Sequence, residues 1–306
     1  MLKTQEITLN MGPQHPSTHG VFHVILKMDH EVITEATPVC GYLHRGIEKL
    51  AEARTYTQVI PYTDRMDYLA AMLNNTGYCM TLEKMMGIEV PERAEYIRVI
   101  CNELSRIASH LIAIATYSVD LGGFTGFFYG LRDRELILDL LEEICGSRMT
   151  FSYMRIGGVA EDIPDGWLEK VIKFCDYMPA CIDEYDGLIT GNEIFQARTK
   201  FVGVIPPEKA INYSLSGPNL RGSGVNFDLR KNRPYGIYDR FDFEVPLGEH
   251  GDTYDRYMMR ILEMRESVKI LQQALRDIPP GPVMDPKAKV RGLRPKPGEA
   301  YARIEA

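Results

Sequence analysis

Residues 10–20, "NMGPQHPSTHG", place two imidazoles, His15 and His19, in a loop that two prolines stiffen. An imidazole on a rigid loop can ligate a metal ion, transfer a proton near neutral pH, or cap a turn. The two histidines are four residues apart, but Pro16 forbids the continuous helix on which a His-Glu-x-x-His zinc site is built. Because the loop also lacks a carboxylate to complete a metal shell, we expect no metal here. Proton transfer and turn capping remain open.

Two later segments combine charge with tyrosine or with glycine. Residues 41–68 are rich in charged and tyrosyl side chains and include Arg45, Arg65 and Tyr68. Such a run is typical of a solvated helix face. Asp120 ends a strongly apolar stretch and enters the glycine- and aromatic-rich sequence "LGGFTGFFYG". A carboxylate at that place is either a local cap or the buried partner of a cation.

The first forty residues are expected to form a small sheet. Three segments rich in β-branched residues, "QEITL", "GVFHVILKM" and "EVITEA", are separated by the histidine loop and by the short turn "DH". The histidine loop therefore connects two strands, and Gly12 and Gly20 allow its bends.

From about residue 64 the apolar period becomes helical. An apolar stripe follows Pro91, a favoured residue in a first helical turn; it comprises Ile97, Ile100, Cys101, Leu104, Ile107, Leu111 and Ile114. We expect a second helix over "RDRELILDLLEEICG", closed by Gly146. A third covers "GWLEKVIKFCDYM", capped by Asp165 and ended by Pro179. The fold class is therefore α+β, with a small N-terminal antiparallel β-sheet followed by a mainly α-helical body.

The chain divides into three expected parts. Residues 1–40 form the sheet region, residues 41–278 the helical body with a long loop region at about 202–250, and residues 279–306 a proline-rich basic tail. The final "AYARIEA" begins to alternate like a strand and then stops. A strand without a partner at a chain end is unusual, so we expect the chain to be cut short there.

Composition restricts the function classes. The 306 residues are 45% apolar and 25% charged, with a formal net charge of −7, which argues against a nucleic-acid partner. The longest strongly apolar stretch, "HLIAIATYSV", is about half of what spans a bilayer. The N-terminus lacks a charged-then-apolar signal pattern. Six cysteines occur without a Cys-x-x-Cys pair, which is typical of a reducing, cytosolic compartment.

The chain's motifs resemble those of the D subunit of NADH–quinone oxidoreductase, the quinone-site subunit in the peripheral arm of respiratory complex I. The motifs extend over essentially the whole chain: "MGPQHPSTHG", "GYLHRGIEKL", "RTYTQVIPYTDRMDY", "NELSRIASHL", "DLGG", "MRIGGVAEDIP", "GVIPPE", "SGVNFDLRK" and "VPLGEHGDTYDRY". That family is related to the large subunit of nickel–iron hydrogenases, whose Cys-x-x-Cys pairs ligate the metals. This chain has no such pair, so it cannot build the hydrogenase metal site.

The resemblance implies a role for each candidate residue. His19 would face the quinone head-group, Tyr68 would form a hydrogen bond to the other side of the same carbonyl region, and Asp120 would pair with His19 and keep it protonated. A quinone that takes two electrons also takes two protons, and tyrosine and imidazole are suitable donors. Arg45 and Arg65 would lie near the terminal [4Fe–4S] cluster, which a neighbouring subunit ligates. Their positive charge would favour the reduced cluster.

The partners implied are the cluster-bearing B subunit, the C subunit and the membrane-arm H subunit, with quinone as the substrate. The chain would act only within the complex, a proton-translocating NADH:quinone oxidoreductase, as a peripheral subunit at the cytoplasmic face of the bacterial cell membrane. Two alternatives stay open: the same role in a ferredoxin-fed relative of complex I, and a scaffold subunit that has lost activity through truncation.

One residue departs from the family pattern. Thr150, in "SRMTFSYMRIGG", occupies a place where the family often has a histidine close to the cluster. An imidazole there takes up a proton when the cluster is reduced, because the added negative charge raises its pKa. A threonine hydroxyl cannot do so. The sequence therefore predicts that the midpoint potential of the cluster is lower than it would be beside a histidine and is nearly independent of pH around neutrality. His44, beside Arg45, is the one histidine that the fold could bring to this place instead.

Overall fold

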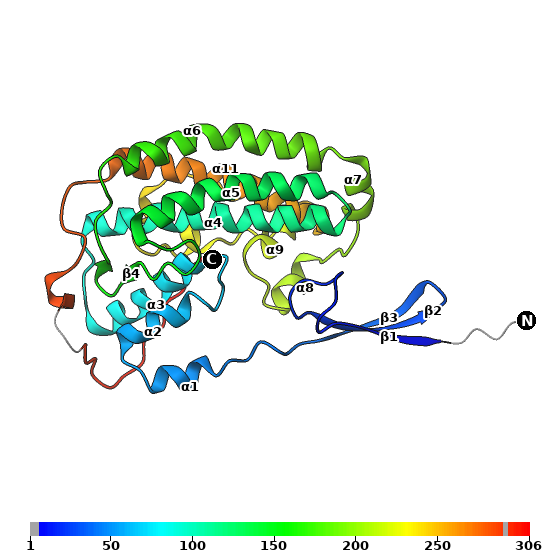
Figure 1. Cartoon of the computed structure of the whole chain (residues 1–306), viewed down its shortest axis with the longest axis horizontal. Coiled ribbons are helices and arrows are strands. Elements are labelled where there is room, and N and C mark those ends of the chain that lie inside the picture. The colour runs from blue at the N-terminus through cyan, green and yellow to red at the C-terminus, as the bar shows by residue number, and fades with distance from the viewer. Residues whose placement is uncertain (1–5, 290–292) are drawn as a thin grey trace, which may run out of the picture. The chain divides into compact units, whose positions relative to one another are not determined.

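The computed structural model describes residues 6–289 and 293–306 (Figure 1). Residues 1–5, where the first predicted strand begins, and residues 290–292 of the predicted tail lie outside the described residues. The chain forms two compact units, Met1–Arg54 and Thr55–Ala306.

The first unit contains a three-stranded antiparallel sheet in the order β1 (Ile7–Met11), β2 (His23–Asp29) and β3 (Val32–Val39). Asn10 is paired with Ile25, and Leu26 with Ala36. A short helix, α1 (Ile47–Glu52), follows the sheet. The predicted small N-terminal antiparallel sheet is confirmed, and the histidine loop connects β1 to β2.

The second unit is mainly helical, as the apolar periodicity predicts. Its α-helices, with a small hairpin of β4 and β5 among them, are in chain order α2 (Tyr56–Thr63), α3 (Ala71–Met86), α4 (Glu92–Asp120), α5 (Phe124–Cys145), β4 (Met154–Arg155), β5 (Gly158–Val159), α6 (Trp167–Tyr185), α7 (Glu193–Thr199), α8 (Pro207–Asn212), α9 (Gly217–Gly222), α10 (Leu229–Asn232) and α11 (Thr253–Asp277). The segment 202–250 holds α8, α9 and α10 joined by irregular stretches.

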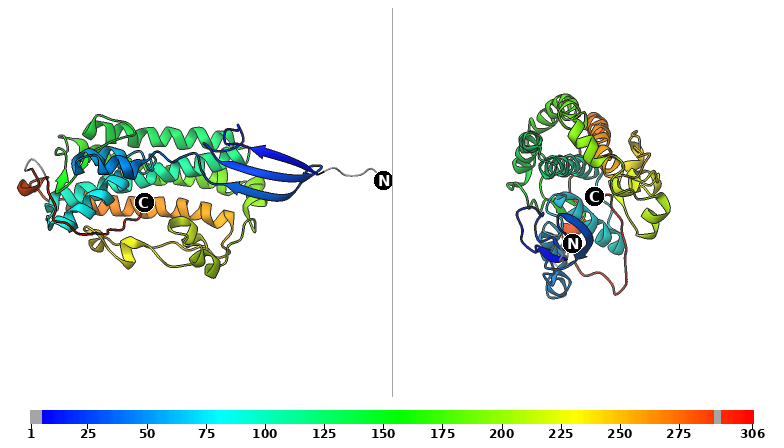
Figure 2. Two further views of the ribbon diagram at one scale, coloured as in Figure 1. Left: turned by 90° about the horizontal axis from the view of Figure 1, so that it is seen from below. Right: turned by 90° about the vertical axis from the view of Figure 1, so that its right-hand side faces the viewer.

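Four long helices, α4, α5, α6 and α11, form the centre of this unit. Contacts join α4 to α5 and α11, and α6 to α5 and α11, so the four helices make a bundle (Figure 1; Figure 2). The predicted stripe on α4 is fully buried from Ile97 to Ile114. Removing its apolar side chains from water is the main driving force for this packing.

The boundaries of two predicted helices differ in the structure. Gly166, not Asp165, is the N-cap of α6, and the helix continues through Pro179 to Tyr185. A proline costs one backbone hydrogen bond inside a helix. Met178 and Ile182, on either side of Pro179, are fully buried, and this packing keeps the helix continuous. Gly146 closes α5 in a left-handed conformation as predicted, but α5 already begins at Phe124, within the glycine- and aromatic-rich sequence.

Candidate functional site

The loop between β1 and β2 is held by hydrogen bonds of its own. Nδ1 of His15 accepts from the backbone N–H of Ser17 at 3.1 Å, and the carbonyl of His15 accepts from the N–H of Thr18 at 3.0 Å. Gly12 has φ +97°, and a Cβ there would lie 2.2 Å from the carbonyl oxygen of Phe22. Glycine is therefore required at that bend. His15 caps the turn, which is one of the two roles the sequence left open.

The side chain of His19 is exposed on the same loop, whereas His15 is half-buried. Arg45 is exposed between β3 and α1. A third histidine, which sequence reasoning missed, connects these two regions: the ring of His23 lies 3.1 Å from Oδ1 of Asn10 and 3.2 Å from the hydroxyl of Tyr42. His23 therefore fixes the chain just before Arg45 to the sheet that carries the His19 loop. This contact depends on how the strands pair, and no sequence motif indicates it.

Arg65 and Tyr68 lie in the second unit, on the short segment between α2 and α3. Nη1 of Arg65 donates to the carbonyl of Pro61 at 2.8 Å. Asp67 braces the turn, because its carboxylate accepts from the N–H of Leu69 at 3.2 Å. The Tyr68 side chain is exposed. The structure thus brings Arg65 and Tyr68 together on one surface segment.

Asp64 lies directly beneath this segment and is completely buried. Its Oδ2 accepts from the backbone N–H of Ser152 at 3.0 Å and lies 3.5 Å from Nη1 of Arg65. Its Oδ1 has no hydrogen-bond partner among the residues that the structure describes. Burial raises the pKa of Asp64 to about 6, against the opposing effects of Arg65, the Ser152 N–H, Asn75 and Arg155. Sequence reasoning missed Asp64, because a carboxylate in "TDRMDY" looks like part of a solvated face.

Asp120 is the exposed last residue of α4. The turn that follows it is tight: the N–H of Gly123 donates to the carbonyl of Ser118 at 2.7 Å, and the Ser118 hydroxyl donates to the carbonyl of Gly123. A Cβ at Gly126 would lie 2.6 Å from the Ser118 hydroxyl. The glycines therefore allow α5 to pack closely against α4, and this packing fixes the position of Asp120.

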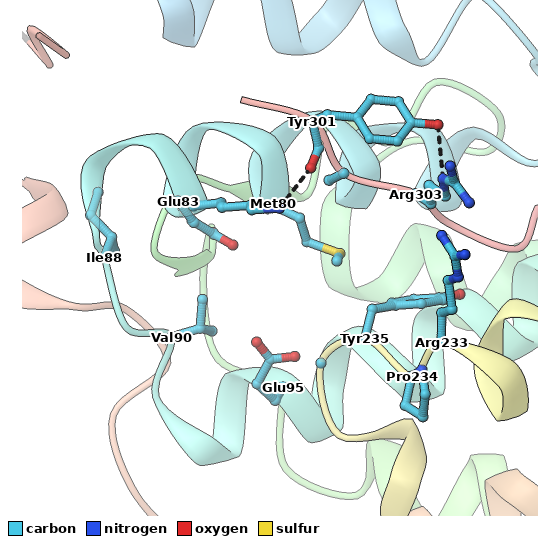
Figure 3. A pocket seen from close by; sticks show the side chains of 13 residues that line it. Met80, Glu83, Ile88, Val90, Glu95, Arg233, Pro234, Tyr235, Tyr301 and Arg303 are labelled. Atoms are coloured by element: carbon cyan, nitrogen blue, oxygen red, sulfur yellow. Dashed lines mark hydrogen bonds between the residues drawn. The ribbon is translucent and has the colours of Figure 1, made fainter. Parts of the chain in front are cut away.

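A cavity beside this turn has a volume of about 200 Å³ and is lined by the turn itself and by residues around α7, including Ser118, Gly122, Ile189, Asn192 and Phe195. A larger cavity of about 470 Å³ lies elsewhere in the second unit, between α3, the start of α4 and residues 301–303. The Glu83 and Glu95 carboxylates face it (Figure 3). Glu83 is already paired with Arg98 at 2.6 Å, and none of the predicted site residues lines this cavity.

Among residues 6–289 and 293–306, no helix is long and apolar enough to cross a membrane. Within the same residues, no three histidine, cysteine, aspartate or glutamate side chains gather as a possible metal site.

Similarity to known sequences identifies the family of this chain. A family model described as "Respiratory-chain NADH dehydrogenase, 49 Kd subunit" matches residues 120–306. Proteins named as the D subunit of NADH-quinone oxidoreductase match the whole chain: that of Desulforamulus reducens is 63% identical, that of Carboxydothermus hydrogenoformans 60%, and that of Bacillus cereus 56%. The chain covers 83% of the length of each of these relatives. It belongs to the D-subunit family of NADH–quinone oxidoreductase, as its motifs predict.

Proposed function

We propose that this chain is the quinone-site subunit of a proton-translocating NADH–quinone oxidoreductase and is active only within that complex. The observation that carries the proposal is the 63% identity over all 306 residues with a relative named as the D subunit of NADH-quinone oxidoreductase. We further propose that the B, C and H subunits of the complex are its neighbours, and that the chain is bound peripherally at the cytoplasmic face of the membrane.

His19 and Tyr68 are the proposed groups at the quinone. Reduction to quinol adds one proton to each carbonyl oxygen, so each oxygen needs a donor within hydrogen-bond reach. The phenol of Tyr68 and the imidazole of His19 are donors of that kind, and both side chains are exposed on their own units. Asp120 pairs with His19 in this proposal and favours its protonated form.

Arg45 and Arg65 are proposed to lie beside the [4Fe–4S] cluster that the B subunit ligates. This cluster supplies the electrons to the quinone. The guanidinium groups stay charged throughout the biological pH range. Their positive charge favours the reduced cluster and so raises its potential. Anchoring of Arg65 to the Pro61 carbonyl restricts where that charge can move.

The Tyr68→Phe substitution tests the proposal in the assembled complex. It removes the hydroxyl but keeps the ring, so quinone reduction should be largely abolished while NADH still reduces the iron–sulfur clusters. Tyr213→Phe is the matched control, because Tyr213 is also an exposed tyrosine of the second unit. Quinone reduction at the wild-type rate in an assembled Tyr68→Phe complex would refute the proposed site.

A further inference from the structure

Asp64 is a buried carboxyl group that the proposed quinone site does not use. It lies at the C-terminal end of α2, and its side chain contacts Arg65 and the backbone of Ser152, which lies between α5 and β4. A buried carboxylate normally has both oxygens paired, because an unpaired buried charge is costly. Within the described part of the chain, only Oδ2 of Asp64 is paired, with the Ser152 N–H and Arg65. The ionised form of Asp64 is therefore incompletely stabilised.

Asn75 on α3 is a polar neighbour of Asp64. Its hydrogen bonding lowers the pKa of Asp64 and so favours the ionised form. Its amide orientation is fixed, because Nδ2 donates to the Ile60 carbonyl at 3.1 Å and to the Thr63 hydroxyl at 2.7 Å. That hydroxyl in turn donates to the Ile60 carbonyl. Oδ1 of Asn75 is therefore an acceptor, and like Oδ1 of Asp64 it has no partner among the described residues. Protonation of Asp64 removes the cost of burying a charge whose second oxygen has no donor among the described residues.

The charged and titratable groups that act on Asp64 come from each element around it. Arg65 lies on the adjoining turn and Arg155 on β4, and both favour the ionised form. The Asp64 charge also acts to raise the pKa of two thiols, those of Cys79 on α3 and Cys145 at the end of α5. Burial outweighs the two arginines, and the pKa of Asp64 rises to about 6. Asp64 is therefore mostly ionised above about pH 7, and a modest further rise in its pKa suffices to protonate it there.

We propose that Asp64 binds a proton when an electron arrives at the neighbouring [4Fe–4S] cluster and releases it when the electron passes to the quinone. The inference rests on the proposed function, which puts Arg65 beside that cluster. The electron comes from NADH through the other clusters, and the proton comes from solvent. The reduced cluster carries one more negative charge, and that charge favours the neutral carboxylic acid over the carboxylate.

This inference revises what Thr150 alone predicts. A threonine hydroxyl cannot take up a proton, but the fold places the Asp64 carboxylate on the N–H of Ser152, two residues further along the same segment. The midpoint potential of the cluster should therefore fall with rising pH. The fall should start near the pKa that Asp64 has while the cluster is oxidised, about 6. If one proton binds per electron, the fall in midpoint potential approaches about 59 mV per pH unit. For a one-electron step, this corresponds to a tenfold change in the equilibrium constant. Below about pH 5 the slope should vanish.

The experiment is a redox titration of the terminal cluster by electron paramagnetic resonance in the intact complex, from about pH 5 to about pH 8. Asp64→Asn keeps the size of the side chain and an oxygen for the Ser152 N–H, and it should remove the slope. Glu161→Gln is the matched control, because Glu161 is an exposed carboxylate near the same segment and should leave the slope unchanged. A merely structural role of Asp64 would shift the potential equally at every pH.

A further variant separates the failure of this inference from the failure of the proposed function. Arg65→Met removes a positive charge and should lower the cluster potential at all pH values. If Arg65→Met has no effect, the cluster does not lie beside this segment and the proposed function fails here. If Arg65→Met lowers the potential but Asp64→Asn retains the wild-type slope, only the assignment of Asp64 is overturned. Should Asp64→Asn fail to assemble, the wild type decides: a flat potential overturns the inference, and a slope that begins near pH 6 supports it.

Discussion

The backbone N–H of Ser152 donates a 3.0 Å hydrogen bond to Oδ2 of Asp64, although 88 positions separate the two residues in sequence. The bond ties the segment that carries Arg65 and Tyr68 to the segment between α5 and β4. Ser152 has φ +44°, a conformation that a residue with a Cβ rarely adopts without support. The buried carboxylate thus supports an unusual backbone conformation and also braces two exposed candidate site residues.

Asp64→Asn should make the chain more stable at neutral pH. Burial raises the pKa of Asp64 above that of an aspartate in the unfolded chain. The folded state therefore binds the proton more tightly, and stability is lost as the pH rises from about 4 to about 6. Asparagine carries no charge, so above that range the variant should gain roughly 1 to 3 kcal/mol in the free energy of unfolding.

Urea unfolding of the wild type and the variant at two pH values measures this gain. It should be present at about pH 8 and absent at about pH 4. Equal stability of the two proteins at both pH values would show that ionised Asp64 is fully compensated by its neighbours.

His15 and His19 should respond differently to the same substitution. An asparagine at position 15 can accept the Ser17 N–H as the imidazole does, because asparagine side chains readily bond to the backbone two residues on. His15→Asn should therefore keep most of the quinone reduction rate. An asparagine at position 19 cannot transfer a proton, so His19→Asn should slow turnover by roughly 10²-fold or more. Steady-state quinone reduction by the two assembled variants makes the comparison, and an equal loss in both would mean that the loop shape alone matters.

Gly126 and Gly130 test the packing that positions Asp120. A Cβ at Gly126 would lie 2.7 Å from Cδ1 of Ile189, and one at Gly130 would lie 2.8 Å from Cβ of Ala115. Alanine at either position should therefore overpack the contact of α5 with these neighbours and lower the free energy of unfolding by about 1 to 3 kcal/mol. Gly187→Ala is the control, because a Cβ there meets no heavy atom within 4 Å. Thermal unfolding of the three variants tests the prediction, which fails if all three unfold together with the wild type.

The sequence predicted the elements better than their ends. Apolar periodicity gave the stripe of α4, and β-branched runs gave the three strands. Pro179 misled the prediction, because its local cost is one hydrogen bond while the helix buries apolar residues on both sides of it. The sequence did not indicate the start of α5, because glycine lowers helix propensity. In the structure, the close packing of α5 against α4 requires glycine there.

The candidate site was predicted through motifs, and motifs carry no information on burial. Arg65 and Tyr68 lie on one exposed segment, which their spacing already indicated. Asp64 is adjacent to Arg65 in sequence and equally polar, yet it is fully buried. Its burial depends on the packing of Asn75 and Ser152 from distant parts of the chain. Those contacts exist only in the folded unit, so no local pattern could indicate the altered carboxyl group.

Glu103, in the middle of α4, receives hydrogen bonds from four buried side chains. Its carboxylate lies 3.2 Å from Arg106 and 3.1 Å from Arg230, and it accepts from the hydroxyls of Tyr238 and Ser267, each at 2.7 Å. Burial by itself raises the pKa of Glu103, but the two guanidinium groups and the hydroxyls outweigh it and hold the pKa below its usual range. These contacts join α4 to α10 and α11.

Glu103→Gln should therefore lower the free energy of unfolding by about 3 to 5 kcal/mol, because it removes the carboxylate that pairs with the buried Arg106 and one of the two that pair with the buried Arg230, which keeps Asp228. A carboxyl group with a lowered pKa contributes stability that is present above the unfolded value, about 4, and is lost as the pH falls. The difference between wild type and variant should thus narrow in acid. Glu92→Gln on the same helix removes an exposed ion pair with Arg240 and should cost no more than about 1 kcal/mol. Urea unfolding at about pH 7 and about pH 4 measures both variants, and a Glu103→Gln protein as stable as Glu92→Gln would contradict the assignment of Glu103 as the centre of this network.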